Sequence, residues 1–385
     1  MKILIFSEAC FNDNIFPLYR KMKEMGVDVT CLINLSSLKI SLFNIEKRIP
    51  KNAIIKASEY KELSMYNKYM DMSDLYLVNH EVDRKHPWRE ITRTIEVYRF
   101  IKKGNFDVIH TDILFRRSYM LLYAFRNKTM FVQHDTFAHT GMEFSKSYQI
   151  YLSIAHKYLK CITILNKKDY NSFCTNYKLS PSRVFVNKLG LLDCMTIYSD
   201  DRIEERKNNV LFFGRIVKYK GIEYLCEAMV KVHKHIPDAT VTIAGAGEYY
   251  FDKSPFEKLN YFEFYNRFIE EKELAKMLQE CSVSICAYTD ATQSGGVLTS
   301  FAMGKPVIAT NIETMKEVVC DGKFGLLVPP RDSDALADAI IRLLKDNNLR
   351  KSISENIKME YSQGERSWSY IANQYISIYN KMQKI

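Results

Sequence analysis

The sequence predicts an α/β protein with two doubly wound domains, each built on a parallel sheet covered by helices. Short apolar runs rich in β-branched residues alternate with helical patterns along the whole chain, as expected for strands buried on both faces. A length of 385 residues exceeds what one hydrophobic core usually organises. With 47% apolar residues, 14 glycines and 9 prolines, the chain does not belong to a disordered or fibrous class.

The expected strands fall into two sets. In the first half they are Lys2–Phe6, Val29–Ile33, Asp107–His110, Met130–His134, Cys161–Leu165 and Arg183–Asn187. In the second half they are Val210–Phe213, Thr240–Gly245, Tyr261–Tyr265, Val283–Ala287, Val307–Thr310 and Gly325–Val328.

The domain boundaries follow from what lies between and after these sets. The polar segment YSDDRIEERKNN (Tyr198–Asn209) separates them, so we expect one domain over residues 1–197 and a second over 198–365, facing a central cleft. A closing helix over 366–385 is expected to pack back toward the first domain, because its apolar residues have three-four spacing, at Trp368, Ile371, Tyr375 and Ile378.

Charge and cysteine content narrow the class further. Residues 1–200 contain 30 Lys and Arg against 20 Asp and Glu, and the remainder contains 25 of each, so the net charge of +10 belongs to the first half. Such asymmetry suits an acidic partner surface. The nine cysteines have no CxxC spacing, which indicates reduced thiols rather than a zinc site or disulfides and hence a cytoplasmic protein. No window approaches 18 uninterrupted apolar residues, so no membrane span is expected.

In α/β folds of this kind ligands bind outside the carboxyl ends of the strands, so the loops after strands hold the candidate sites. In VLFFGRIVKYKGIEYL (Val210–Leu225), Gly214, Arg215 and Lys220 lie between a strand and a helical pattern. Two cations beside a helix start predict a diphosphate clamp, with Arg215 bidentate and Lys220 as a point charge. The alternative is a pair of solvated loop cations.

A second loop, in TIAGAGEYY (Thr242–Tyr250), has Gly245 and Gly247 directly after a strand. These glycines permit close approach of another backbone. Tyr250 occupies the place of the third glycine of a GxGxxG fingerprint, so the loop is weak evidence and does not indicate NAD.

A third loop lies in YTDATQSGGVLTSFAMGKPVIAT (Tyr288–Thr310), where Ser294, Gly295 and Gly296 lead into a helical run. Free amides at a helix start carry partial positive charge and bind phosphate oxygens. Ser294 is alternatively an ordinary N-cap.

Taken in order, these loops resemble the retaining glycosyltransferases of family 4, which have the two-domain GT-B fold. The resemblance covers about Val210 to Ala339 through FFGRIVKYKG, TIAGAG, ELAKMLQECSVSICAY and GKPVIATNIETMKEVVCDGKFGLLVPPRDSDALADAI. It is specific as a combination, although each motif alone is common. The first half resembles the family more weakly, through FDVIHTD (Phe106–Asp112) and FVQHDTF (Phe131–Phe137).

The resemblance implies a nucleotide diphosphate sugar as donor, of the UDP or GDP type, and no cofactor. It implies that Arg215 and Lys220 grip the pyrophosphate and that Asn266–Phe268 contact the base. His134 matches a histidine near the transferred sugar and acceptor, with a core histidine as the alternative. The first domain would bind the acceptor and the second the donor. The residues that the resemblance places on the nucleotide sugar are Gly214, Arg215, Lys220, Gly245, Arg267, Phe268, Ser294, Gly295, Gly296, Val297 and Thr299.

The sequence departs from the family at two carboxylates. Two family glutamates, eight residues apart, fall on Ala291 and Thr299. The family's glycine-rich N-terminal loop is replaced by SEACFNDNIFPLY (Ser7–Tyr19), which puts the acceptor site in doubt. A rival interpretation is therefore a catalytically inactive nucleotide-sugar-binding protein of the same fold.

No metal is expected. Preorganised cations and amides stabilise a leaving diphosphate without one, and DSD (Asp332–Asp334) precedes a helical pattern, which favours helix capping over metal binding.

The basic first half suits a glycan or lipid-linked acceptor in surface polysaccharide or glycolipid assembly, with an anionic membrane face as a further partner. In HPWREITRTIEVYRFIKK (His86–Lys103) cations surround an apolar stripe of Trp88, Ile91, Ile95 and Tyr98, so the helix either lies on that face or packs its stripe inward. Arg116 and Arg117 would extend the basic surface. No signature of a nucleic-acid-binding fold is present.

Overall fold

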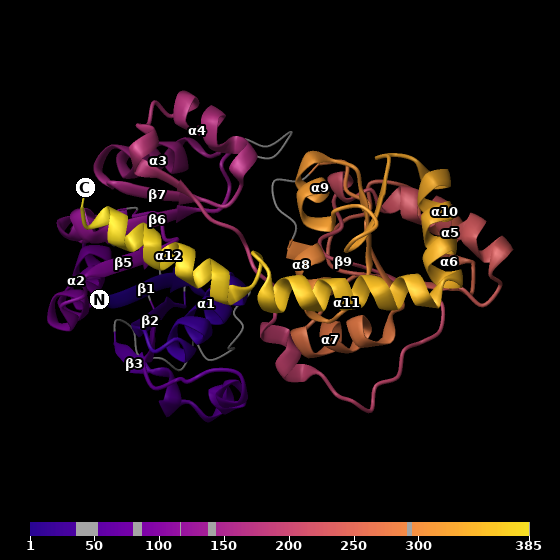
Figure 1. Ribbon diagram of the computed structural model, residues 1–385, viewed down its shortest axis with the longest axis horizontal. Helices are drawn as coiled ribbons and strands as arrows, with labels where there is room; N and C mark the ends of the chain where they lie inside the picture. Colours follow the sequence, from indigo (N-terminus) through magenta and orange to yellow (C-terminus); the bar gives the residue numbers. More distant parts are fainter. Residues whose placement is uncertain (36–52, 80–86, 116, 138–143, 291–294, 385) are drawn as a thin grey trace. The chain divides into compact units, whose positions relative to one another are not determined.

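The computed structural model describes residues 1–35, 53–79, 87–115, 117–137, 144–290 and 295–384 (Figure 1). The chain divides into two compact units, one formed by Met1–Gly190 with Glu365–Ile385 and the other by Leu191–Gly364. The division after Gly190 lies seven residues before the expected boundary after residue 197. The segment that follows belongs to the second unit because Met195 packs against Met277 and Leu278 there.

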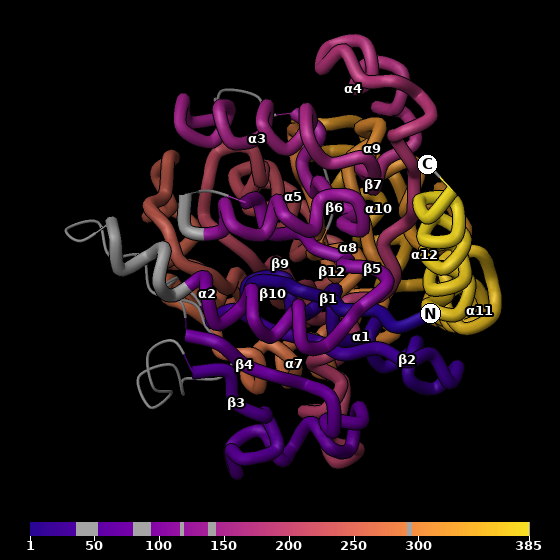
Figure 2. Tube along the Cα trace, turned by 90° about the vertical axis from the view of Figure 1, so that its left-hand side faces the viewer, coloured from indigo at the N-terminus to yellow at the C-terminus, as the bar shows by residue number. Residues whose placement is uncertain are grey.

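The first unit contains an eight-stranded sheet in the order β3-β4-β2-β1-β5-β6-β7-β8. Its strands are β1 (Lys2–Glu8), β2 (Asp28–Asn34), β3 (Ile54–Lys56), β4 (Leu75–Val78), β5 (Val108–Thr111), β6 (Thr129–Gln133), β7 (Cys161–Ile164) and β8 (Val184–Val186). All neighbours are parallel except β3 and β4. In Figure 2 these strands follow one another from β3 at the bottom to β7 near the top.

Helices cover this sheet and complete its core. They are α1 (Asn12–Glu24), α2 (Pro87–Gly104), α3 (Lys146–Tyr158), α4 (Tyr170–Asn176) and the C-terminal α12 (Trp368–Met382), with 3-10 segments at Ala9–Phe11, Ala57–Glu59, Lys61–Lys68, Arg117–Lys128, Lys167–Asp169 and Pro181–Arg183. The α12 helix packs on α1. The apolar residues with three-four spacing in this closing helix are buried. His110 Nδ1 lies 2.6 Å from the Tyr379 hydroxyl oxygen. The closing helix therefore belongs to the core of the first unit.

The second unit contains a six-stranded parallel sheet in the order β11-β10-β9-β12-β13-β14. Its strands are β9 (Asn209–Phe213), β10 (Thr240–Ala244), β11 (Phe262–Tyr265), β12 (Val283–Cys286), β13 (Val307–Thr310) and β14 (Gly325–Val328). Its helices are α5 (Ile222–His235), α6 (Ser254–Glu257), α7 (Glu271–Glu280), α8 (Gly295–Ala302), α9 (Glu313–Val319), α10 (Ser333–Lys345) and α11 (Asn347–Gln363), with 3-10 segments at Cys194–Tyr198 and Lys218–Lys220.

Each expected strand is present, with ends within two residues of those expected, and β3 and β4 are additional. The parallel strands of the second sheet are almost wholly buried, which explains their continuous apolar runs. The edge strand β3 has three residues and none of them is buried, so no such run marks it.

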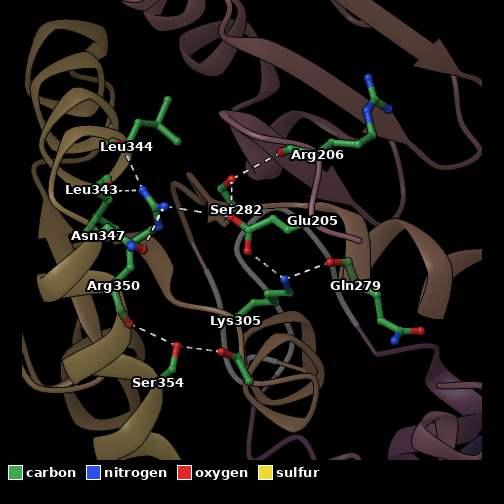
Figure 3. Close-up of polar contacts among 11 residues, drawn as sticks. Glu205, Arg206, Gln279, Ser282, Lys305, Leu343, Leu344, Asn347, Arg350 and Ser354 are labelled. Carbon is green, nitrogen blue, oxygen red and sulfur yellow. Dashed lines mark hydrogen bonds and ion pairs between the residues drawn. The ribbon is translucent and has the colours of Figure 1, made fainter. Parts of the chain in front are cut away.

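A polar network ties the start of the second unit to its last helices (Figure 3). The Lys305 ammonium donates to the Gln279 carbonyl oxygen at 2.9 Å and lies 3.4 Å from a Glu205 carboxylate oxygen. The other Glu205 oxygen accepts from the Ser282 hydroxyl at 2.8 Å. Arg350 donates to the last carbonyl groups of α10, at Leu343 and Leu344. Lys305, in the Gly-Lys-Pro sequence after α8, thus has a structural role.

Each sheet has a point at which the strand order reverses. In the first sheet β1 lies between β2 and β5, and in the second β9 lies between β10 and β12. The crevice outside the carboxyl ends at such a point is where open α/β sheets bind ligands. The loops after β9 and β12, and those after β1 and β5, are therefore the places to examine.

Candidate functional site

The loop after β9 is held against the end of β12. The 3-10 turn Lys218–Lys220 ends at Gly221, which has the left-handed φ of 64°. A Cβ on Gly221 would lie 2.1 Å from the Ala287 carbonyl oxygen, so only glycine fits there. The amide of Thr289 donates to the Tyr219 carbonyl oxygen at 2.7 Å. The two loops that flank the reversal of strand order are thus joined directly.

Lys220 lies on the face of Tyr288. Its ammonium nitrogen is 3.6 Å from the centre of the Tyr288 ring, and the Tyr288 side chain is buried. Burial lowers the pKa of Lys220 to about 8; the nearby Cys286 opposes this shift and the Arg215 charge adds to it. Cation–π contact orients the ammonium. No carboxylate of the described residues contributes to the pKa of Lys220. Such a cation favours a negatively charged ligand.

Arg215 is the more exposed of the two predicted cations. It follows Gly214 at the end of β9, and its guanidinium lies 3.4 Å from the Tyr219 hydroxyl oxygen. The same turn therefore carries Arg215 and Lys220, as the clamp interpretation requires.

The start of α8 lies beside the hydroxyl group of the same tyrosine. A Cβ on Gly296 would lie 2.9 Å from the Tyr288 hydroxyl oxygen and 3.6 Å from the Cys286 sulfur. The first amides of an eight-residue helix such as α8 have no carbonyl partner within the helix. Tyr288 thus contacts Lys220 through its ring face and the start of α8 through its hydroxyl group.

The other residues predicted to bind the nucleotide sugar in this loop differ in their exposure to solvent. Gly295 is exposed, whereas the side chains of Val297 and Thr299 are buried. Val297, in the first turn of α8, therefore offers a ligand its backbone amide, whereas Thr299 lies beyond the four amides that a helix leaves unpaired. Ser294 and Ala291 lie outside the described residues.

The loop after β10 continues beside the loop after β9. The Gly214 amide donates to the Ala244 carbonyl oxygen at 3.0 Å and the Ile216 amide to that of Ala246 at 2.9 Å. Gly245 has φ 156°, and a Cβ there would lie 1.8 Å from the Gly214 carbonyl oxygen. Gly245 therefore allows the two loops to approach each other, as its position predicts.

Tyr250, at the place of the missing third glycine, caps the helix of the first loop. Its hydroxyl oxygen accepts from the Ile222 amide, the first residue of α5, at 3.0 Å, and the hydroxyl donates to the Glu223 carboxylate. Capping satisfies an amide that has no partner within the helix. The sequence comparison with GxGxxG gave no sign of this role.

Arg267 and Phe268 follow the edge strand β11 and are exposed. The Arg267 guanidinium forms a two-pronged ion pair with the Glu273 carboxylate, with N–O distances of 2.7 and 2.5 Å. Strand β10 lies between β11 and β9, and no contact found for Arg267 or Phe268 in the described chain joins them to Lys220 or α8.

In the first unit, His134 lies beside a buried carboxylate. Its ring stacks on Phe11 with centroids 4.2 Å apart and planes 3° apart. Its Nε2 atom is 3.5 Å from an Asp112 carboxylate oxygen, which also accepts from the Ser7 hydroxyl at 2.8 Å. These three polar residues follow or end β6, β5 and β1, at the reversal of strand order. The other Asp112 oxygen is buried without a hydrogen-bond partner in the described part of the chain.

With this geometry established, the chain was compared with known proteins. Residues 207–346 match the family model described as glycosyl transferases group 1. The chain is 24% identical over 303 residues to an uncharacterized glycosyltransferase of Methanocaldococcus jannaschii, covering 73% of this chain and 76% of that protein. It is 31% identical over 176 residues to a phosphatidyl-myo-inositol mannosyltransferase of Mycobacterium leprae, covering 44% of this chain and 46% of that protein.

One solved structure similar over nearly its whole length is Anabaena HepE in complex with UDP, with a TM-score of 0.64, 15% identity, and coverage of 98% of this chain and 99% of that one. The chain has the GT-B fold. The family match and the named relatives support a glycosyltransferase of the GT-B type.

Three other expectations concern this GT-B chain. No group of three or more potential metal ligands gathers among the described residues. In the same residues no helix is long and apolar enough to span a membrane. Asp332 caps α10 by accepting from the amides of Asp334 and Ala335, so the capping interpretation of DSD is confirmed.

The α2 helix is present, and the described residues of one side pack on the core, whereas Arg99, Lys102 and Lys103 are exposed. Thr94, Val97 and Ile101 are buried, and Tyr98 packs against the core of the first unit. The side chains of Trp88 and Ile91, and those of Arg116 and Arg117, lie outside the described set.

Proposed function

We propose that this protein is a retaining glycosyltransferase of family 4 that transfers a sugar from a nucleotide diphosphate sugar to a glycan or lipid-linked acceptor. The observation that carries the proposal is the pair of positive groups on Tyr288, with the Lys220 ammonium 3.6 Å from its ring centre and α8 beginning at its hydroxyl. A diphosphate has the charge and the oxygens to bind both. Similarity to a protein whose structure holds UDP supports a donor of the UDP type.

The reaction places negative charge on the leaving diphosphate. Lys220, Arg215 and the amides of Gly295, Gly296 and Val297 supply positive charge fixed before the reaction, which stabilises that charge as it develops. Since the chain itself provides these groups, we propose transfer without a metal ion. In the front-face mechanism of retaining transfer a donor phosphate oxygen accepts the acceptor's proton, so no protein base is required.

We further propose that His134 hydrogen-bonds the transferred sugar or the acceptor. The Asp112 carboxylate, itself fixed by Ser7, lies 3.5 Å from the His134 Nε2 atom, and such a neighbour favours one orientation of the imidazole ring. The first unit would then bind the acceptor and the second the donor. Arg267 and Phe268 would contact the base, for which Arg267 must leave Glu273 or bind through its free edge.

The cellular setting is proposed by analogy. The basic first half suits an anionic acceptor or membrane face, in surface polysaccharide or glycolipid assembly on the cytoplasmic side. The rival is an inactive nucleotide-sugar-binding protein, favoured by Thr299, which is buried with a short side chain where a family glutamate is expected.

Calorimetric titration with UDP-, GDP- and ADP-sugars tests donor binding, followed by turnover of the labelled donor over a panel of acceptors with and without EDTA. Arg215→Ala and Lys220→Ala should each weaken donor binding about tenfold or more, and Lys207→Ala, an exposed cation paired with Asp238, serves as the matched control. Binding without hydrolysis or transfer would favour the inactive form. Absence of binding, with no effect of Arg215→Ala, would contradict both.

A further inference from the structure

The first unit contains a cavity of about 740 Å³. It is lined by α3, by the end of α4 and by the turn that leads into β8, and none of the candidate site residues lines it. Its volume lies in the range of about 300–1,000 Å³ typical of small-molecule sites. None of the roles proposed for the candidate site residues involves this cavity.

Three cations line this cavity, namely Lys157, Lys178 and Arg183, and no carboxylate side chain does. None of the three forms an ion pair with a carboxylate in the described chain. One Arg183 nitrogen donates to the carbonyl oxygens of His156, at 2.6 Å, and Leu159. These bonds fix the guanidinium and leave its other N–H groups for a ligand. The cavity therefore favours an anion.

The end of α4 places Lys178 at the cavity. Lys178 has φ 52° directly after α4, the left-handed conformation in which helices commonly end. Its amide donates to the Thr175 carbonyl oxygen at 3.2 Å, and the Leu179 amide donates to that of Cys174 at 2.9 Å. This turn therefore fixes the backbone of a lysine that lines the cavity.

His156 adds a hydrogen-bond acceptor to this cationic wall. Its Nε2 atom lies 2.8 Å from the Gln133 Oε1 atom, and the Gln133 amide nitrogen donates to the Asp135 carbonyl oxygen, which leaves Oε1 as the acceptor. Nε2 therefore carries the hydrogen. Burial, with a smaller contribution from Arg183, lowers the pKa of His156 to about 4, so the ring is neutral and Nδ1 keeps a lone pair.

The Nδ1 atom of His156 has no partner in the described chain. It accepts a hydrogen bond, but an ionised carboxylate or a phosphodiester has no hydrogen to donate to it at neutral pH. A ligand that satisfies the whole cavity must therefore combine a hydroxyl donor with a negative charge. The half-buried Tyr177 ring and the exposed Asn176 amide in the same wall suit the C–H faces and hydroxyls of a sugar.

We propose that this cavity binds a short acidic glycan, two or three sugar units bearing a carboxylate or phosphate, at a site separate from the site of transfer. This proposal rests on the proposed function in one respect, the purpose of the cavity: it would hold a charged acceptor chain while the end of that chain reacts. Glycan binding here would make longer acidic acceptors better substrates without a new contact at the reacting end.

The test measures binding of α-1,4-trigalacturonate to the full chain by calorimetry, with maltotriose as the neutral probe and inorganic phosphate as the anion without a sugar. The double variant Lys157→Gln/Lys178→Gln changes two exposed cavity lysines. Lys102→Gln/Lys103→Gln makes the same charge change at exposed positions of α2 that do not line the cavity. Thermal melting checks that both variants fold.

Trigalacturonate should bind the wild type at least about tenfold more tightly than maltotriose or phosphate do. The cavity variant should weaken it about tenfold or more, and the α2 variant less than about twofold. Phosphate binding as tight as trigalacturonate, or equal loss in both variants, would overturn the proposal. A third result would also overturn it: trigalacturonate does not bind, and the cavity variant loses binding to phosphatidylglycerol vesicles. That result would indicate a membrane contact instead.

A parallel titration with UDP separates this proposal from the proposed function. UDP affinity should be unchanged in the cavity variant, because neither lysine lies in the loops around Tyr288. If the wild type neither binds UDP nor transfers sugar, the proposed function fails. The trigalacturonate titration still shows whether the cavity binds an acidic glycan.

Discussion

The partly buried Lys220 makes a quantitative prediction about the pH dependence of nucleotide binding. Burial beside Tyr288 lowers the pKa of Lys220 to about 8 in the free protein. A lysine is charged below its pKa, so the free protein offers a full cation below about pH 7 and loses it as the pH rises through about 8. A bound diphosphate favours the charged form and raises the pKa.

The size of the effect follows from the charged fraction. With a pKa of about 8, about nine-tenths of the free protein carries charged Lys220 at pH 7 and about one-tenth at pH 9. If the complex stays charged throughout, the dissociation constant for UDP rises about tenfold between these values, which corresponds to about 1.4 kcal/mol.

Calorimetric titration of UDP from pH 6.5 to 9.5 at fixed ionic strength measures this dependence. Lys220→Arg is the matched variant, since its side chain stays charged over the whole range. Ionisation of the uracil ring and of the phosphates is common to both proteins, so the difference between the two profiles reports Lys220. Parallel profiles would refute the assignment of Lys220 to the diphosphate.

Three further substitutions test the geometry around the site, each by urea denaturation. Gly245→Ala should destabilise the fold by about 2 kcal/mol or more, because its Cβ would lie 1.8 Å from the Gly214 carbonyl oxygen; an unchanged midpoint would mean that the loop relaxes freely. Tyr250→Phe should cost about 1 kcal/mol, since it leaves the Ile222 amide without its cap. Lys305→Met should cost about 1–2 kcal/mol while UDP binding stays as in the wild type, and a loss of UDP affinity would contradict its structural role.

Sequence patterns predicted the parallel strands because burial on both faces leaves a long apolar run, as in β9 and β13. The same patterns could not find β3, which lies at an edge, pairs antiparallel and buries no residue. Spacing after strands also located Gly214, Lys220 and Gly296. These residues are close because parallel strands place their carboxyl ends on one edge of a sheet.

Residues that act through distant partners escaped the sequence analysis. Asp112 contacts Ser7 across 105 positions of the chain, and only the pairing of β1 with β5 brings them together. Tyr288 belongs to the glycine-rich stretch that follows β12, but its contacts with Lys220 and Gly296 depend on how two loops meet.

Burial of Lys220 beside Tyr288 also lowers the stability of the folded protein at neutral pH. The shift of the Lys220 pKa from 10.5 to about 8 corresponds to about 3 kcal/mol of destabilisation of the charged form. A pKa of about 8 is the net result of burial and of every contact of the ammonium, so the whole cost of about 3 kcal/mol is present below pH 8. The unfolded chain binds this proton more tightly than the folded one, so the cost is present at neutral pH and disappears as the pH rises from 8 toward 10.5.

Lys220→Met should therefore be more stable than the wild type at pH 7 without ligand, by up to about 3 kcal/mol. UDP at about 100 times its dissociation constant should stabilise the wild type by about 2.7 kcal/mol and the variant much less at the same concentration. Thermal melting with and without UDP measures both effects. A variant less stable than the wild type would mean that Lys220 serves the fold. The opposite signs expected for stability and for ligand response mark a cation kept for an anionic ligand, because no carboxylate in the described residues contributes to the pKa of the buried ammonium.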